Sequence, residues 1–167
     1  FRSPKKEAKI LDLTKGNIRF MQGFSVVDES GNIIRIIDFI KGKTLADSVL
    51  LLGKEYEDYF HNHFPRVLDE FVELVKAIRF LHENGEKHGD IRRDHIIKEA
   101  ETGTARWIDF DFNYLHKENM FGYDLFGLGN ILAYLTGRGD VTIQHLRETG
   151  SPALDCLTAD DMNIIFN

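Results

Sequence analysis

Several features that define whole classes of proteins are absent from this sequence. Its 167 residues include one cysteine, Cys156, which excludes an internal disulfide framework and a zinc site built on thiolates. No apolar run approaches the roughly 18 residues that span a bilayer. The first residues also lack the basic-then-apolar pattern of a signal peptide. We therefore expect a cytoplasmic chain with no membrane partner.

Positive charge is also scarce. Twenty-one lysines and arginines against 27 aspartates and glutamates give a net charge of -6, so we expect no nucleic-acid partner. The chain is 43% hydrophobic, which at this length is enough to bury one substantial core. We expect one domain or a piece of a longer one, because the chain starts at Phe1 and a helix would normally continue past residues 162–166. The oligomeric state is left open.

The first 45 residues predict a helix followed by a hairpin. Ser3-Pro4 is typical of a helix start, and this short helix is predicted to end near Gly16. The β-branched and aromatic residues of 24–39 predict two strands around a polar turn. Residues 41–43 are predicted to break the second strand, and Thr44 to begin another helix.

The remaining residues predict mostly helix. Residues 65–81 carry a wide apolar stripe between charged positions, and Asn84-Gly85 ends this helix. A second hairpin is predicted over 96–108, and a further helix over 123–135 that closes at Gly137. The fold class that this pattern predicts is α+β.

Acidic side chains gather in two segments near the second hairpin. Asp90 lies in a loop, where catalytic groups tend to collect, and Asp109 and Asp111 lie among large apolar residues at the end of a strand. Buried carboxylates need a cation, and a divalent metal is the usual one where two acids converge. The alternative is that Asp90 and Asp109 only cap turns, as aspartates commonly do.

In order and spacing, these segments resemble the protein-kinase-like superfamily. His88-x-Asp90 followed by position 95 resembles the catalytic loop His-Arg-Asp-Leu-x-x-x-Asn, and Ile108-Asp109-Phe110 resembles Asp-Phe-Gly. Residues 36–45 resemble the hinge between kinase lobes. Residues 123–132 resemble the central helix of the large lobe, in which an aspartate, here Asp124, caps the catalytic-loop backbone. The resemblance covers about residues 5–136.

The resemblance implies a protein-kinase-like fold divided near the hinge. Residues 1–40 would form an incomplete small lobe of a helix and a β-hairpin. Residues 41–167 would form a mostly helical large lobe that is truncated at the C-terminus. His88 would brace the catalytic loop rather than touch substrate.

The resemblance also implies a phosphotransferase that uses ATP and Mg²⁺. Asp90 would orient the attacking hydroxyl, Asp109 would hold magnesium against the β- and γ-phosphates, and Arg92 would reach the transferring phosphate. Position 95 is His where the family has a second metal ligand, and Asp111 replaces the glycine of Asp-Phe-Gly. We therefore include His95 and Asp111 among the candidate metal ligands.

Four further residues would contact ATP or position it. The main chains of Asp38 and Ile40 would bind adenine, with Ile97 as an apolar floor. Glu7 matches the helix glutamate that pairs with the ATP-positioning lysine. No Gly-rich loop or lysine-bearing strand precedes Glu7 in this sequence. The alternative function is therefore a pseudokinase or nucleotide-binding regulatory module without catalytic activity.

The phosphate acceptor is expected to be a hydroxyl of a small molecule or of an atypical protein site. Only 15 positions separate Asp109 from Asp124, and no Ala-Pro-Glu follows. That leaves no room for the long activation segment that binds peptides in protein kinases. The pattern Asp-Phe-Asp is similar to the Ile-Asp-Phe-Glu-Tyr segment of choline and aminoglycoside kinases.

Overall fold

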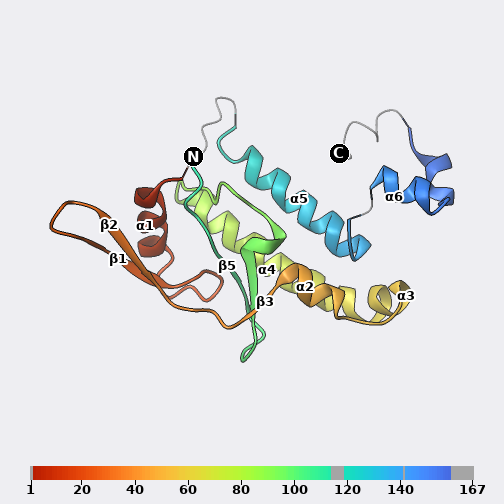
Figure 1. The fold of residues 1–167 in the computed structure, drawn as a ribbon, viewed down its shortest axis with the longest axis horizontal. Helices are drawn as coiled ribbons and strands as arrows, with labels where there is room; N and C mark the ends of the chain where they lie inside the picture. Colours follow the sequence, from red (N-terminus) through yellow and green to blue (C-terminus); the bar gives the residue numbers. More distant parts are fainter. Residues whose placement is uncertain (1, 114–118, 141, 159–167) are drawn as a thin grey trace.

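The computed structural model describes residues 2–113, 119–140 and 142–158 (Figure 1). Helix α1 and a two-stranded hairpin lie at one end, a three-stranded sheet and helix α4 at the centre, and helix α6 at the far end. The elements follow one another in this order: α1 (Pro4–Leu13), β1 (Gly23–Val27), β2 (Ile33–Ile37), β3 (Gly42–Thr44), α2 (Leu45–Leu50), α3 (Tyr56–Asp58), a π-helical turn (Tyr59–His63), α4 (Phe64–Glu83), a 3₁₀ turn (Arg93–His95), β4 (Ile96–Glu99), β5 (Ala105–Trp107), α5 (Gly122–Gly137), α6 (Ile143–Glu148) and a second 3₁₀ turn (Pro152–Cys156).

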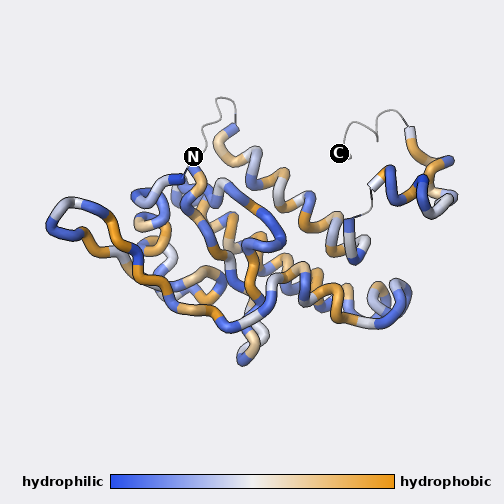
Figure 2. Tube along the Cα trace, in the orientation of Figure 1, coloured by the Kyte–Doolittle hydropathy of each residue, from blue (hydrophilic) through white to orange (hydrophobic). Residues whose placement is uncertain are grey.

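The helix and hairpin predicted at the start of the chain are confirmed. The Ser3 side chain accepts a hydrogen bond from the Lys6 backbone N–H, as an N-cap does. Strands β1 and β2 pair antiparallel, with Gly23 opposite Ile37 and Val27 opposite Ile33. Apolar side chains of both strands remain exposed, and Figure 2 shows hydrophobic stretches along this hairpin.

The second strand, β2, does end before residue 41, as predicted, but residues 41–43 are not simply a break. Gly42 and Lys43 belong to a further strand, β3, which pairs antiparallel with β4 in a sheet of order β3-β4-β5. A Cβ on Gly42 would lie 2.1 Å from the Lys98 carbonyl oxygen, so only glycine lets the two strands approach this closely. The strand has three residues and no apolar alternation, which is why its sequence gives no strand signal.

The core is built on α4, which the apolar stripe predicted. Six of its side chains are buried, and burying a large aliphatic or aromatic side chain contributes about 1.5–3 kcal/mol. Fully buried Trp107 packs on this helix and donates a hydrogen bond from Nε1 to the Leu74 carbonyl, 3.0 Å away. The buried side chains of α4 are Val67, Phe71, Leu74, Ala77, Ile78 and Leu81.

The predicted hairpin over 96–108 and the predicted helix over 123–135 are also confirmed, as β4–β5 and α5. Helix α5 ends at Gly137, as predicted. The residue that follows it, Arg138, is left-handed, at φ 53°. The Arg138 guanidinium donates to three carbonyls, those of Leu50, Gly53 and Lys54. These bonds hold a conformation that glycine would adopt more readily.

Two expectations about the chain are not tested by this fold. Residues 162–166 lie outside the described residues, and the division at residue 40 stays a prediction. In the part of the chain that the structure describes, no helix has the length and apolar character needed to cross a membrane.

Candidate active site

Asp124 at the start of α5 holds the main chain of the loop that contains Asp90. Its carboxylate accepts hydrogen bonds from the backbone N–H groups of His88 and Gly89, at 2.8 and 2.7 Å, and lies 2.9 Å from His82 Nε2. Burial opposes the charged form, but the bonds from His82 and from the backbone outweigh burial and lower the pKa of Asp124. The predicted capping of this loop by Asp124 is confirmed.

His88 braces the same loop from inside the core. Its Nδ1 faces the Asp90 backbone N–H at 3.3 Å, and its ring packs edge-on against Trp107 and Phe110. The side chain is fully buried, and this burial lowers the pKa of His88 to about 3. The ring is therefore neutral and structural, as the sequence predicted.

Acid is expected to destabilise the fold through His88. An unfolded histidine titrates near pH 6.5, so between that pH and about 3 the unfolded chain binds the extra proton. The contribution of neutral His88 to stability is complete above about pH 6.5. As the pH decreases below this value, the free energy of unfolding falls by up to about 1.4 kcal/mol per pH unit. Urea unfolding between about pH 4.5 and 7.5 measures this slope.

His88→Asn is expected to flatten the slope by about one proton, whatever its effect on absolute stability. The matched control is His145→Asn, which replaces an exposed histidine on α6 and should keep the slope of the unchanged protein. An identical pH dependence in His88→Asn and the unchanged protein would assign the acid sensitivity to other groups.

The carboxylates of Asp90 and Asp109 lie on either side of one imidazole ring. His95 Nδ1 is 2.9 Å from the Asp90 carbonyl oxygen and 3.6 Å from its carboxylate, while Nε2 is 3.5 Å from the Asp109 carboxylate. Both carboxylates are partly exposed, at 24% and 32%. The structure thus brings together two aspartates that are 19 positions apart in the sequence.

The backbone of Asp109 has an unusual conformation. Its φ is 65°, in the left-handed region that few residues other than glycine adopt. Such conformations cluster at functional sites, where the surrounding structure holds them. Here the Met21 N–H bonds to the Trp107 carbonyl and the Ile108 N–H bonds to the His95 carbonyl, which ties down the segment before Asp109.

Two arginines that the sequence analysis did not identify border the site. Asp111 is buried, and its Oδ2 lies 3.1 Å from Arg2 Nη1 and 3.8 Å from Arg35 Nη1. Glu7, also buried, forms an ion pair with Arg35 on β2. Arg2 reaches Asp109 at 3.8 Å. The cation beside Glu7 in the described residues is therefore an arginine, and Asp111 is already charge-balanced.

Within the described part of the chain, no metal site is made from protein side chains alone. In residues 2–113, 119–140 and 142–158, no three His, Cys, Asp or Glu side chains are grouped to hold an ion. Among the candidate metal ligands, Asp109 has the most accessible carboxylate. Magnesium usually takes only one or two protein carboxylates and completes its shell with water and phosphate oxygens.

Two of the expected adenine-binding residues, Asp38 and Ile40, lie between β2 and β3, and the third, Ile97, lies on β4. The Asp38 N–H donates to the Gln22 carbonyl at 2.9 Å. No hydrogen bond to the Asp38 carbonyl or the Ile40 N–H is seen within the described part of the chain. Ile97 is half-buried and lies opposite Thr44 of β3.

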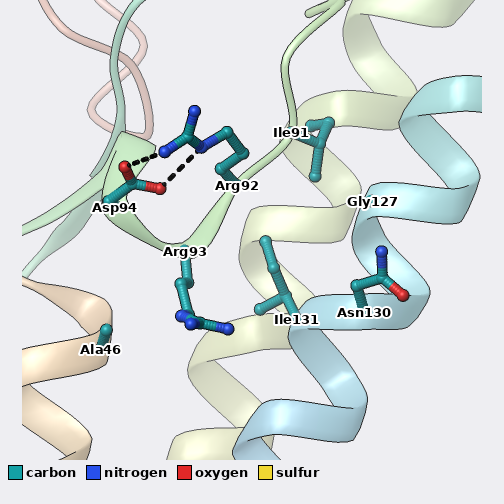
Figure 3. A pocket seen from close by; sticks show the side chains of 8 residues that line it. All are labelled: Ala46, Ile91, Arg92, Arg93, Asp94, Gly127, Asn130 and Ile131. Atoms are coloured by element: carbon teal, nitrogen blue, oxygen red, sulfur yellow. Dashed lines mark hydrogen bonds and ion pairs between the residues drawn. The ribbon is translucent and has the colours of Figure 1, made fainter. Parts of the chain in front are cut away.

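A cavity of about 470 Å³ opens beside the loop that carries Asp90 (Figure 3). Arg92 lies on it but is engaged by Asp94, through bonds of 3.0 and 2.6 Å that raise the pKa of Arg92. Arg93 pairs with Asp140 and stacks on a tyrosine of α5. The residues that line the cavity are Ala46, Ile91, Arg92, Arg93, Asp94, Gly127, Asn130 and Ile131.

Comparisons with known proteins point to one family. No family model matches the chain. A probable serine/threonine-protein kinase, fnkE, of Dictyostelium discoideum is 30% identical over 132 residues, which are 76% of this chain and 10% of that protein. CDPK-related kinase 4 of Arabidopsis thaliana is 23% identical over 64% of this chain, and a putative ribosomal protein S6 kinase alpha-2 of Caenorhabditis elegans is 24% identical over 69%. The chain spans 19% and 14% of these two proteins.

A solved structure shows the same fold. The PK-1 kinase of Cydia pomonella granulovirus superposes with a TM-score of 0.67 over 96% of this chain and 64% of the viral chain. The two sequences are 16% identical, so the likeness concerns architecture. The α+β architecture with small antiparallel sheets, predicted from the sequence, is confirmed.

Proposed function

Because the chain belongs to the protein-kinase-like superfamily and spans part of its relatives, we propose that it carries the catalytic site of an ATP- and magnesium-dependent phosphotransferase. The observation that supports this most directly is the placement of Asp90 and Asp109 on either side of His95. In this proposal the γ-phosphate of ATP passes to a hydroxyl group, and the two carboxylates have different tasks.

Asp90 orients the acceptor hydroxyl and takes its proton. Its carboxylate is partly exposed, and its backbone is held from both sides, by the His88 ring and by His95 Nδ1. A base held in place by its neighbours needs little reorganisation before the reaction. The 2.9 Å contact from His95 to the Asp90 carbonyl keeps the imidazole beside the carboxylate without closing it off.

Asp109 is the residue that fits magnesium. Its carboxylate lies 3.5 Å from His95 and 3.8 Å from Arg2, both longer than a direct hydrogen bond, so its oxygens remain available. Asp111 fits less well because it is buried against Arg2, and an imidazole such as that of His95 is a poor ligand for a hard cation. When bound, magnesium would neutralise charge on the β- and γ-phosphates.

The nucleotide would lie between the hinge segment and β4. The Asp38 carbonyl and the Ile40 N–H supply the acceptor and donor that an adenine edge requires, and Ile97 supplies an apolar floor. Glu7 and Arg35 form an ion pair, and Arg35 lies 3.8 Å from the Asp111 carboxylate. Arg35 then takes the place that a lysine has in the resemblance, and it presents a fixed positive charge near the phosphates.

The acceptor would enter through the cavity beside Ile91 and Arg92. Its volume of about 470 Å³ suits a small molecule or a short segment of protein. Arg92 and Arg93 are both paired with carboxylates there, so the lining is close to neutral. Arg92 would reach the transferring phosphate only by exchanging its bonds to Asp94 for bonds to the phosphate.

Calorimetry with ATP, with and without Mg²⁺, tests this assignment. We expect the full-length protein to bind ATP more tightly with Mg²⁺, and Asp109→Asn to remove most of that gain because an amide carries no charge for the cation. Asp12→Asn, on the exposed face of α1, is the control and should leave the gain intact. Binding that ignores Mg²⁺ in the unchanged protein would instead indicate a nucleotide-binding module, and no binding at all would contradict the proposal.

A further inference from the structure

Lys6 on α1 is a buried lysine at the junction of both catalytic segments. Its Nζ donates to the carbonyls of His88, Phe110 and Phe112, at 2.5, 2.8 and 2.7 Å. An ammonium has three donors, and here all three are used. The acceptors lie 82 to 106 positions away, one before Asp90 and two after Asp109.

Gly89 leaves the room that the ammonium occupies. Its φ is 88°, and a Cβ at this position would lie 3.1 Å from Lys6 Nζ and 2.3 Å from the Phe112 carbonyl oxygen. A side chain on residue 89 would therefore displace either the lysine or the segment that follows Asp109. The absence of a side chain at Gly89 leaves the space that the Lys6 ammonium occupies.

The charge on Lys6 is held mainly by carbonyl dipoles. Burial lowers the pKa of Lys6 to about 8, while Asp124, Glu86 and Asp111 oppose this and Lys87 adds to it. An ammonium is costly to bury, and it is retained here because three oxygens replace its water. The Lys6 ammonium can form all three hydrogen bonds only when the segment before Asp90 and the segment after Asp109 are both in place.

We propose that Lys6 is a positioning residue that sets the placement of Asp90 relative to Asp109. It joins α1 to the main chain two residues before Asp90 and to the residues that follow Asp109. Its neighbour Glu7 joins α1 to β2 through Arg35, so one turn of α1 connects both parts of the site. The role of Lys6 in turnover rests on the proposed phosphotransferase function. The structural link, which is the set of three hydrogen bonds from Lys6 to the two segments, does not depend on that function.

Lys6→Met tests the proposal in the full-length protein, with Lys5→Met, on the exposed side of α1, as the matched control. We expect Lys6→Met to lower kcat by about 10- to 100-fold while KM for ATP stays nearly constant, because a small misplacement of reacting groups affects the chemical step. Lys6→Arg should not restore kcat, since a planar guanidinium cannot satisfy three converging carbonyls in a site shaped for an ammonium. Full activity in Lys6→Met with only lower stability would reduce Lys6 to a structural role and overturn the proposal.

Amide hydrogen exchange provides a readout that is independent of activity. Lys6→Met should speed exchange in both 88–91 and 109–112, while Lys5→Met should change neither. If Lys6→Met does not fold, Lys6→Gln, which keeps two donors, replaces it. Faster exchange in Lys6→Met, together with no ATP turnover by the unchanged protein, would contradict the phosphotransferase proposal and keep the structural link. Exchange that Lys6→Met leaves unaltered in both segments would contradict the link itself.

Discussion

Asp90→Asn is expected to lower phosphate transfer about 10³-fold and to leave ATP binding nearly unchanged. A positioned general base contributes roughly 10²- to 10⁴-fold, and an amide cannot take a proton. The replacement has the same shape. It also keeps the main-chain contacts of residue 90 with His88 and His95, so the loop should hold its conformation.

Steady-state ATP turnover and calorimetry on the same samples separate the two effects. Asp69→Asn, on the exposed face of α4, makes the same chemical change away from the site and should keep full turnover. Equal turnover in Asp90→Asn and the unchanged protein would show that Asp90 is not the base. Loss of both turnover and ATP affinity would point instead to a displaced loop.

The candidate residues Asp90, His95 and Asp109 could be selected from the sequence because their order and spacing resemble the catalytic loop and the Asp-Phe-Gly segment of kinases. The ionic partners could not be predicted in the same way. Lys6 lies 104 positions from Phe110, and Arg2 lies 109 positions from Asp111. Only the packing of α1 against the catalytic segments makes these residues neighbours.

The elements of the fold also differ in how far they could be predicted from the sequence. Helix α4 runs for 20 residues, so its apolar period repeats often enough to be recognised. Strand β3 has three residues, two of them exposed, and exists because β4 offers it a hydrogen-bonding edge. The end of α5 depends on Arg138 reaching three carbonyls near residue 53, again a contact between distant segments.

Two glycines of α5, both in helical conformation, are expected to respond to alanine in opposite directions. A Cβ on Gly127 would lie 2.6 Å from Ile91 Cβ and 2.7 Å from the Ile91 carbonyl oxygen. Ile91 directly follows Asp90, and backbone cannot move aside as a flexible side chain can. Gly127→Ala should therefore push the catalytic loop away from α5, reduce the free energy of unfolding by about 1–3 kcal/mol and lower turnover as well.

Gly129→Ala provides the matched comparison, because a Cβ at Gly129 would have no atom within 4 Å. Alanine is a better helix former than glycine, so this variant should gain about 0.5–1 kcal/mol and keep its activity. Urea unfolding of both variants gives the two signs directly. If Gly127→Ala were as stable and active as Gly129→Ala, the close contact between Gly127 and Ile91 could not be what fixes the distance between α5 and the Asp90 loop. The hydrogen bonds of this loop with Asp124, His88, His95 and Lys6 would then have to set the placement of Asp90.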